Sequence, residues 1–423
     1  MLYIKNGNYK GIIMKQLSTA LSIIAISISL PSYADSFTAR HMGQGFTSLT
    51  HDFTSSISNP ALLTKFDQDD DFYLSLNIGV RASDEYEVID NGEDIADELE
   101  VLEDEINNLT NLAPGQIPAA QADLHQDVDE LVAKLEAVDE KPVQLGIGFN
   151  ALMIIPTNTL SSGLFVNQYG GVGVVIDYDD VDETTLDDAI DDLTLVDIDD
   201  LATSAIGVGY NIVEAGLMFG YQAVKSDAYD LSIGTKIKFQ RVDVFYNNIG
   251  ISDFDDDEFD ITDDEFLTDN DGVNLDLGLY VNWGDERQWS FALIADNILS
   301  QDVELVIADP SIDNINLSVD LKSTIGVGYQ QEWFSISAEL DLTDRVGFKE
   351  LSAPKYASVG AQVNLGEHMQ LRVGARTDLN DVEDDVVTAG FGLSPWDVFS
   401  IDVGAFTGGN DNVGIAVQLG LKI

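Results

Sequence analysis

The sequence has no cysteine among its 423 residues and few basic residues. Without a thiol, the chain can form no disulfide, thiolate metal site or CxxC redox centre, and it offers no N-terminal cysteine for lipid attachment. Only 20 Lys and Arg face 75 Asp and Glu, which gives a net charge of −55. Because phosphate backbones are bound by Lys and Arg, this balance excludes direct, general binding of nucleic acid.

Catalytic motifs are also missing. The sequence contains no GxSxG, HExxH or P-loop, and IGVGY at 206–210 and 325–329 lacks the third glycine of a dinucleotide site. We therefore expect no enzyme activity, no cofactor and no metal site, although His41 and His51 could meet. The acidic loops have two interpretations, a solvated surface or weak surface binding of Ca²⁺, whose oxygen ligands they supply.

The N-terminus has the pattern of an export signal. Residues 17–30 form an apolar core, and residues 31–34 offer small residues at the spacing of a cleavage site. Residues 1–34 are thus predicted to be a signal peptide, with a membrane anchor as the alternative. Fourteen apolar residues are few for a span, and no other window holds about 18 uninterrupted apolar residues.

Period-two alternation recurs along the chain and predicts strands that cross a membrane. Residues 412–423 place six apolar side chains on one face, and residues 272–283 and 355–365 repeat the pattern. A soluble sandwich also alternates, so loop lengths and tryptophans decide between the two. Every second connection is short, and the four tryptophans flank these short turns, as in an aromatic girdle.

We therefore predict an all-β transmembrane barrel with about 14 antiparallel strands, in the outer membrane of a Gram-negative bacterium. Several of the long connections are acidic: residues 179–203 and 252–271 each carry 11 acids and no base. The expected strands are 71–81, 143–155, 162–177, 204–222, 231–250, 272–283, 289–305, 318–330, 333–346, 355–365, 370–379, 386–394, 398–407 and 412–423.

Two segments do not fit the wall. Apolar residues in 84–142 step by three and four, which predicts an extracellular acidic helical hairpin inserted after the first strand. These helices either pack only on each other or also dock a partner. Residues 35–66 are polar and cannot lie in lipid with unpaired backbone, so we expect an N-terminal plug, followed by the barrel at 67–423. Asn59 is suited to cap a short helix beginning at Pro60, Ala61 and Leu62.

The same residues carry a family resemblance. Residues 40–45 (RHMGQG), 59–63 (NPALL) and 66–67 (FD) resemble the outer-membrane conjugal transfer protein TraF family and, more distantly, the FadL fatty acid transporters. FadL proteins have an N-terminal hatch, an NPAL segment and fourteen strands. The resemblance implies contact with outer-membrane lipid and a passive channel for a small hydrophobic ligand. The alternative is an envelope or surface component of a conjugative DNA-transfer or pilus assembly, with partners in the conjugation machinery.

Glycine pairs predict where the plug lies. In four strands, two glycines alternate with apolar neighbours and are expected to face the lumen, where backbone of the plug can approach closely. Relief of crowding is the alternative. The pairs are Gly146 and Gly148, Gly207 and Gly209, Gly326 and Gly328, and Gly390 and Gly392.

Basic residues on two strands are also expected to face the lumen. Lys236, Lys238, Arg372 and Arg376 alternate with apolar residues. Because unpaired charges in a narrow lumen are costly, acidic partners are expected among Asp276, Glu339, Asp341, Asp402 or the plug. A salt-bridged interior and an anion path are both compatible with this pattern.

The fourth strand shows an apparent change of phase. Its even positions are apolar up to Ile212 and its odd positions are apolar from Leu217. We expect a β-bulge near Glu214, Ala215 and Gly216 that turns the acid inward. The wall there either stays closed or forms a lateral opening.

Overall fold

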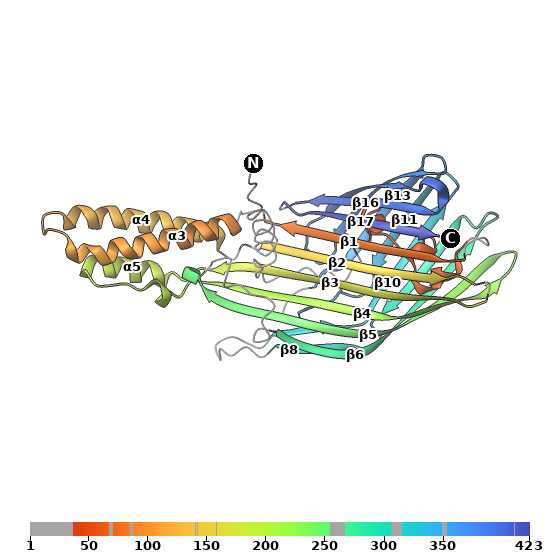
Figure 1. Cartoon of the computed structure of the whole chain (residues 1–423), viewed down its shortest axis with the longest axis horizontal. Helices are drawn as coiled ribbons and strands as arrows, with labels where there is room; N and C mark the ends of the chain where they lie inside the picture. The colour runs from red at the N-terminus through yellow and green to blue at the C-terminus, as the bar shows by residue number, and fades with distance from the viewer. Residues whose placement is uncertain are drawn as a thin grey trace, which may run out of the picture.

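The computed structural model describes residues 37–66, 71–84, 88–139, 141, 143–157, 159–253, 267–305, 315–348, 353–409 and 411–423, and shows a closed antiparallel barrel (Figure 1). Fourteen strands form the wall, as predicted. Neighbours in the wall are consecutive wall strands of the chain. The wall strands are β1 (Tyr73–Ser83), β2 (Val143–Ile155), β3 (Ser161–Asp177), β4 (Ser204–Lys225), β5 (Tyr229–Gly250), β6 (Leu267–Trp283), β7 (Trp289–Asp296), β10 (Lys322–Gln330), β11 (Phe334–Asp341), β13 (Tyr356–Asn364), β14 (Met369–Asp378), β15 (Val386–Leu393), β16 (Phe399–Gly408) and β17 (Val413–Lys422).

Closure of the barrel depends on the pairing of its first and last strands. The register between β1 and β17 runs from Tyr73 opposite Lys422 to Ala82 opposite Val413. A closed wall leaves no strand edge unpaired, which is what a lipid environment requires. In the described part of the chain, no helix is long and apolar enough to cross a membrane.

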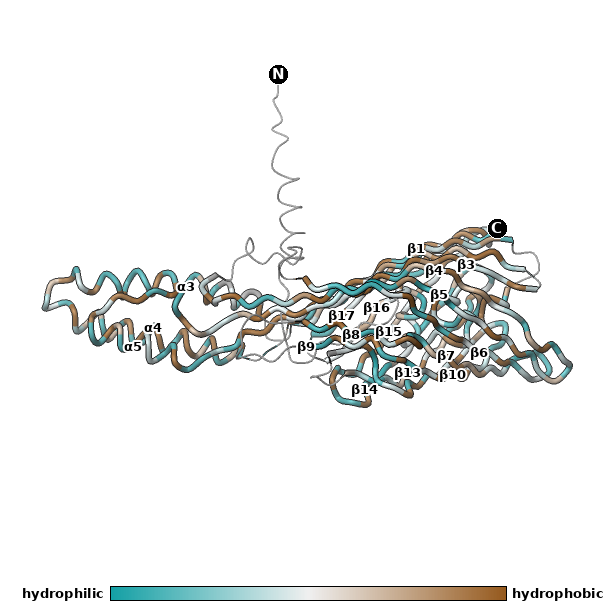
Figure 2. The backbone as a smooth tube through the Cα atoms, turned by 90° about the horizontal axis from the view of Figure 1, so that it is seen from below, coloured by the Kyte–Doolittle hydropathy of each residue, from teal (hydrophilic) through white to brown (hydrophobic). Residues whose placement is uncertain are grey.

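Alternation of side chains explains why these residues form a wall. In β1, Leu76, Ile78 and Val80 are 45%, 53% and 44% exposed, whereas Asn77 between them is buried. Successive side chains of a strand point to opposite faces, so the apolar set faces outward and the polar set faces the lumen. Apolar and polar residues alternate along the other strands as well (Figure 2).

The short turns gather aromatic side chains at the end of the barrel away from the helices. Trp283 and Trp289 pair across the β6–β7 turn, and the ring of Trp289 lies 4.6 Å from that of Tyr329. Trp333 packs on Phe334, with ring centroids 4.4 Å apart. Such a group of amphipathic rings fits the polar boundary of a bilayer.

The prediction of one strand over 289–305 is wrong in its second half. The wall strand β7 ends at Asp296, and Asn297 has a left-handed backbone (φ 54°) that redirects the chain. The following segment forms an inner three-stranded sheet of β8 (Gln301–Leu305), β9 (Ile315–Val319) and β12 (Gly347–Phe348). The sheet packs against the inward side chains of β3, β4 and β5. The apolar residues that alternate along it therefore face the inside of the barrel and not the lipid.

The predicted helical hairpin lies at the long-loop end of the barrel (Figure 1). It consists of α3 (Val88–Asn108) and α4 (Ile117–Val138), whose buried Leu and Ile residues pack between them. A third helix, α5 (Val181–Asp192), was not predicted because its loop is dominated by acids. Its apolar residues Leu186, Ala189 and Ile190 are nevertheless buried against the hairpin.

The remaining helical turns are 3₁₀ helices: η3 (Leu109–Asn111), η4 (Ile198–Asp200), η5 (Ile251–Asp253) and η6 (Pro395–Asp397), in addition to two in the plug.

The three helices are joined to the wall by apolar packing. Val174 and Ile176 at the end of β3, together with Val143 of β2 and Ala205 of β4, belong to the same buried cluster as the helices. These strands extend further than the strands of the opposite wall, and the helices rest on that extension.

A histidine links α5 to the hairpin and makes their contact sensitive to pH. His125 Nδ1 lies 2.6 Å from Asp187 Oδ1, and its Nε2 lies 3.3 Å from Asp191 Oδ1. The hydrogen bond to Asp187 raises the pKa of His125 above its ordinary value of 6.5. A raised pKa means that the charged pair stabilises the contact fully below about pH 6.5 and that this stability is lost as pH rises through the folded pKa.

We therefore expect α5 to loosen as pH rises through the folded pKa of His125. The amides of α5 should exchange with solvent several-fold faster at pH 9 than at pH 6, after correction for intrinsic exchange rates. Hydrogen exchange with mass spectrometry measures this. The His125→Gln variant keeps a hydrogen-bonding side chain but has no titrating ring, so its α5 should show no such difference. An equal pH difference in wild type and variant would assign the effect to other groups.

Candidate functional site: the plugged lumen

The N-terminal segment 37–66 lies inside the barrel. It contains α2 (Ala39–Met42) and the 3₁₀ helices η1 (Phe53–Ser55) and η2 (Pro60–Thr64). The start of η2 is as the sequence indicates, since Asn59 Oδ1 accepts a hydrogen bond from the Ala61 N–H at 3.1 Å and Pro60 holds the first helical position. Pro60, Ala61 and Leu62 are buried. The helix is a short 3₁₀ turn, which suits a segment that only has to redirect the chain toward β1.

The plug approaches the wall most closely at several glycines of the wall. Around η2, a Cβ atom at Gly234 would collide with backbone atoms of Pro60 and Ala61, and one at Gly278 would collide with Asn59. At the other end of the plug, a Cβ atom at Gly374 would collide with the backbone of Gly45. Backbone therefore packs on backbone, an approach that any side chain would prevent.

Several of the predicted glycines lie against the plug. Phe37 covers Gly148, Thr50 approaches both Gly326 and Gly328, and Gly43 approaches Gly390. Gly392 lies against side chains of the wall instead, since a Cβ atom there would meet Asp402, Gln370 and Arg372. Gly146 is paired with Arg81 in the β1–β2 ladder.

Gly207 and Gly209 do not face the lumen, contrary to prediction. They pair with Val174 and Val172 of β3, and Val174 packs on the helices at the outer face of the wall. The inward positions of β4 are the even ones, including Val208 and Tyr210. The prediction failed because those apolar residues were taken to face lipid.

The predicted bulge in the fourth strand is also wrong. Between Ser204 and Gly220, β4 keeps one continuous register with β3, and with β5 it does so up to Gln222. The irregularity lies between Gln222 and Val224, close to a turn. The strand keeps one phase, in which Ile212, Glu214 and Met218 all face inward, so no one-residue shift is needed. Because the ladder is continuous on both sides, the wall has no lateral opening at Glu214, Ala215 and Gly216.

The predicted lumen charges are buried and paired. Lys236 Nζ lies 2.9 Å from Asp276 Oδ2, and Lys238 Nζ lies 2.6 Å from Glu214 Oε1 and 3.1 Å from Asp276 Oδ1. On the other side of the lumen, Arg372 Nη1 lies 2.6 Å from Asp402 Oδ1.

Arg376 has a partner that the prediction did not include. Its Nη2 lies 3.3 Å from Glu383 Oε2, in the loop after β14. Asp341, one of the expected partners, pairs instead with Arg345 at 2.7 Å. Buried charges of one sign are thus matched by the other, because removal from water is offset only by close pairing.

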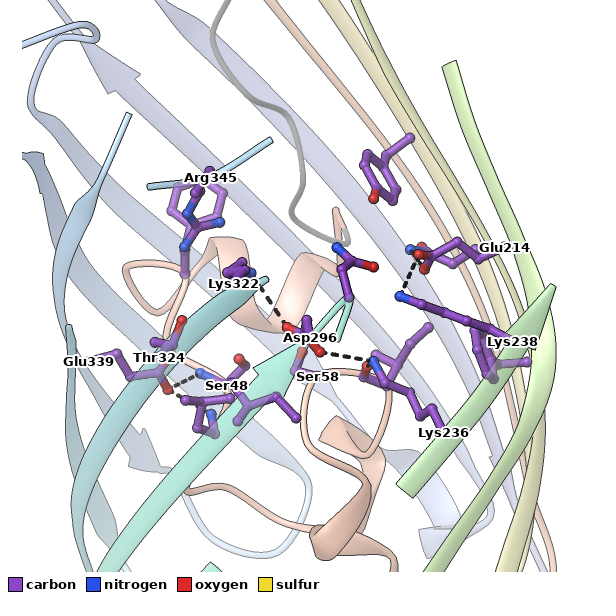
Figure 3. Close-up of a pocket in the computed structure, with 18 residues that line it drawn as sticks. Ser48, Ser58, Glu214, Lys236, Lys238, Asp296, Lys322, Thr324, Glu339 and Arg345 are labelled. Atoms are coloured by element: carbon purple, nitrogen blue, oxygen red, sulfur yellow. Dashed lines mark hydrogen bonds and ion pairs between the residues drawn. The ribbon is translucent and has the colours of Figure 1, made fainter. Parts of the chain in front are cut away.

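A small charged cavity separates the plug from the wall (Figure 3). Its volume is about 70 Å³, which is enough for a few water molecules. Lys236, Lys238 and Lys322 line it together with Glu214, Asp296 and Glu339. The cavity is too small and too polar to hold a hydrocarbon.

Charged wall residues on two sides of this cavity hold the plug backbone. Glu339 Oε1 accepts hydrogen bonds from the N–H groups of Ser48 and Leu49, at 2.5 and 2.6 Å. Lys236 Nζ donates to the carbonyl oxygen of Ile57 at 2.9 Å. Hydrogen bonds to charged groups are stronger than hydrogen bonds between neutral groups. These contacts therefore hold the plug more firmly than the same number of neutral hydrogen bonds would.

Near the helices, the lumen has the opposite character on the side formed by β3, β4 and β5. Wall residues that face inward on this side are apolar, among them Tyr210, Val242 and Val244. They pack on Val303 and Leu317 of the inner sheet. We call this layer the apolar compartment; its other members are Tyr169, Val175, Val208, Ile212, Leu305, Val319 and Val346.

The wall departs from a regular ladder beside this compartment, at what we call the β6–β7 seam. The β6–β7 register covers only Leu277 to Trp283 of β6. Beyond it, the Asn274 side chain bonds both backbone groups of Leu299, at 2.9 and 3.0 Å, and Asp276 accepts from the Asn297 N–H at 2.8 Å. One backbone bond remains here, from the Ile298 N–H to the Leu275 carbonyl oxygen at 3.0 Å, and side chains make the other bonds across this point of the wall.

The two plug histidines lie close together, as the sequence allowed. The rings of His41 and His51 are 6.3 Å apart and nearly parallel. His41 Nδ1 is bonded to the Thr38 hydroxyl and Nε2 to the Ser55 hydroxyl at 2.9 Å. Among the described residues, no group of three or more His, Asp or Glu side chains could hold a metal ion.

A comparison with known protein families gives a match that covers most of the chain. Residues 56–341 match the family described as F plasmid transfer operon, TraF, protein. No curated protein sequence matches the chain.

Several solved structures share the fold. The toluene transporter TbuX of Ralstonia pickettii is 8% identical, with a TM-score of 0.51 over 92% of this chain and 99% of its own. The CymD monoaromatic hydrocarbon channel is 8% identical, with a TM-score of 0.51 over 92% and 98%. A deletion mutant (deltaS2S3) of the monoaromatic hydrocarbon channel TodX is 10% identical, with a TM-score of 0.50 over 92% and 98%. At such identities the likeness establishes the fold.

The contact between η2 and Gly234 gives a direct test of the plug. In Gly234→Ala, the new methyl group collides with backbone of Pro60 and Ala61, which cannot move aside as a side-chain tip can. Overpacking of this kind costs about 1–3 kcal/mol. The population of displaced plug should therefore rise roughly 5- to 150-fold, measured as faster protease cleavage within residues 37–66 of the folded barrel.

Gly392→Ala is the matched control, because its methyl group meets side chains of the wall rather than the plug. It should leave the cleavage rate near that of wild type. Equal cleavage in the two variants would show that Gly234 does not hold the plug.

Proposed function

The chain belongs to the TraF family of the F plasmid transfer operon, and on this premise we propose that it is a passive outer-membrane channel for small hydrophobic molecules. It acts without enzyme activity, and the plug closes it in the conformation described. The apolar compartment is the observation that carries this proposal. A lumen that passed only ions and sugars would be lined by polar side chains on the path of its solutes.

The apolar compartment is suited to exchange one apolar contact for another. The register within the inner sheet joins β8 to β9 over five positions and β9 to β12 over two, and among the described residues no register joins the sheet to the wall. Its contact with the wall is therefore mainly side-chain packing. Burial of apolar surface is worth about 25 cal/mol per Å². A hydrophobic molecule that enters between sheet and wall takes the place of the apolar contacts it separates, so the apolar surface stays buried and little free energy is lost.

Passage beyond the compartment requires a movement. The charged cavity of about 70 Å³ lies below it and does not admit an aromatic hydrocarbon. The β6–β7 seam connects the cavity to the protein surface, since Asp296 and Asn297 line the cavity and Leu299 is exposed. We assign the exit of hydrophobic molecules to this seam, where breaking the side-chain bonds and the backbone bond between Leu275 and Ile298 leaves the β6–β7 ladder from Leu277 to Trp283 intact.

The outer membrane is the location that this architecture supports. The apolar outward faces of the strands suit contact with lipid, and the related folds are those of hydrocarbon transporters and channels by their printed names. The signal peptide predicted for residues 1–34 lies outside the described residues and stays a prediction.

A second function is favoured by the family and by the helices at the long-loop end. As an envelope or surface component of a conjugative transfer or pilus assembly, the chain would use α3, α4 and α5 as a contact surface. Removal of residues 88–138 would then abolish conjugation and leave uptake of hydrophobic molecules unchanged. The reverse result would favour the channel.

The apolar compartment is tested by neighbouring substitutions on one strand of the inner sheet. Leu305→Gln puts an amide among buried apolar side chains, whereas Glu304→Gln changes the adjacent, exposed position of β8. Loss of the buried Leu side chain corresponds to about 1.5–3 kcal/mol of apolar burial. Uptake of a lipophilic dye into liposomes that carry the protein should fall at least tenfold in Leu305→Gln and stay near wild type in Glu304→Gln. Equal uptake in both variants would contradict a path through the compartment.

The β6–β7 seam is tested by a cross-link, for which a chain without native cysteine is well suited. The pair Leu275→Cys and Ile298→Cys, whose half-buried residues are joined across the seam by a backbone bond of 3.0 Å, should lower dye uptake to the level of protein-free liposomes when it is cross-linked by a short bis-maleimide. The control pair, Val213→Cys with Arg241→Cys, joins residues that face each other in the regular β4–β5 ladder. Cross-linking the control pair should leave uptake unchanged. Unchanged uptake after cross-linking the seam would place the exit elsewhere.

A further inference from the structure

The helical hairpin has a groove on one of its faces. The groove lies between α3 and α4 and has a volume of about 400 Å³. It is independent of the lumen and of the proposed channel. Its lining residues are Asp97, Glu98, Val101, Leu102, Glu105, Asp127, Glu130, Leu131 and Lys134.

The floor of the groove is apolar. Leu102 and Leu131 are buried in the seam between the helices, and they form the bottom of the groove. Val101 stands beside them with 59% of its surface exposed. Val101 lies among acidic turns of α3 and is not buried by any part of the described chain. It extends the apolar floor of the groove toward the rim.

The rim of the groove is acidic. Five carboxylates and one ammonium group line it, and the ammonium group of Lys134 is already paired with Glu98. In the described ranges, Lys134 is the only basic residue that forms an ion pair with this rim. A second copy of the chain is a poor occupant, because the net charge of −55 would set acid against acid. Charge complementarity requires a basic partner.

The position of α5 shows what shape of partner fits. Gln121 Nε2 donates to the carbonyl oxygen of Ile190 at 2.7 Å, and His125 pairs with Asp187, so α5 lies along one side of α4. The groove residues of α4, Asp127 and Lys134, lie on the other side by the helical period of 3.6 residues. The groove and α5 therefore lie on opposite faces of the α3–α4 pair, and a helix bound in the groove would pack on the face that α5 leaves open.

We propose that this groove binds a basic amphipathic helix of a partner protein. The apolar stripe of that helix covers Val101, Leu102 and Leu131, and its Lys or Arg residues face the carboxylates of the rim. Helix-in-groove binding of this kind is read as anchors at positions i, i+3, i+4 and i+7 of the partner.

The experiment uses the full chain in nanodiscs of zwitterionic lipid and a synthetic 18-residue peptide of Leu and Lys in amphipathic helical order. The wild-type protein should bind this peptide at least tenfold more tightly than a scrambled peptide of the same composition, as measured by fluorescence anisotropy. Binding should also weaken with added salt, because charged pairs on a surface are screened.

Two double variants with the same change of charge locate the site. Glu105→Gln with Asp127→Asn removes two carboxylates of the rim, and Glu100→Gln with Asp129→Asn removes two exposed carboxylates outside the groove. The first pair should weaken binding at least tenfold and the second less than twofold. Val101→Ser, at an exposed position that the fold does not need, should weaken binding severalfold without change of charge.

Equal binding by the two double variants, or equal binding of the scrambled peptide, would overturn the proposal and leave only attraction between opposite charges. Circular dichroism of each variant checks that the helices remain folded. If the first double variant loses helix content, Val101→Ser alone decides: unchanged binding in that variant refutes the apolar floor.

Discussion

The pairing of every wall strand with two neighbours is the constraint on which the structure depends. A strand in lipid has no water for its N–H and C=O groups, so the ladder must close, and β1 meets β17 to close it. Closure fixes an enclosed volume of limited width, and that volume has to be filled. The plug, the inner sheet and the lumen charges are three ways of filling it, and each meets the wall by a different interaction: backbone against glycine, apolar packing and ion pairs.

The sequence predicted the wall well because its signal is local. Alternation along a strand depends on neighbouring residues, so the positions of most strands and of the hairpin could be read directly. The same signal does not tell which face of the strand points outward. An alternating row of apolar residues looks the same whether it faces lipid or an apolar part of the lumen. Val208 and Tyr210 belong to the second kind, and this caused the errors at Gly207, Gly209 and Glu214. A clue was present in Glu214 itself, which shares the phase of those residues and has Lys238 as a neighbour on the adjacent strand β5.

Features that depend on distant parts of the chain were beyond the sequence. The departure of β7 from the wall at Asn297 and the return of the chain as an inner sheet depend on packing against β3 to β5. Glycines such as Gly234 and Gly374 gain their role only when the plug is in place. The partner of Arg376, Glu383, lies in a loop whose position no local pattern indicates. The motif at Asn59 was readable because a capping residue followed by proline acts within its own turn.

The uneven length of the wall has a consequence for electrostatics at the membrane. The strands β4 and β5 have 22 residues each, whereas β7 and β11 have eight. At about 3.3 Å per residue and a tilt near 40°, the long strands rise roughly 55 Å, against an apolar band of about 25 Å. The groove lies beyond the wall, because Val101 is 13 residues, or about 20 Å, along α3 from Val88, which is more than twice the Debye length of about 8 Å at physiological ionic strength. Counter-ions screen the groove from the charges of the lipid head groups over this distance, so its own carboxylates, and not the membrane, set the local field.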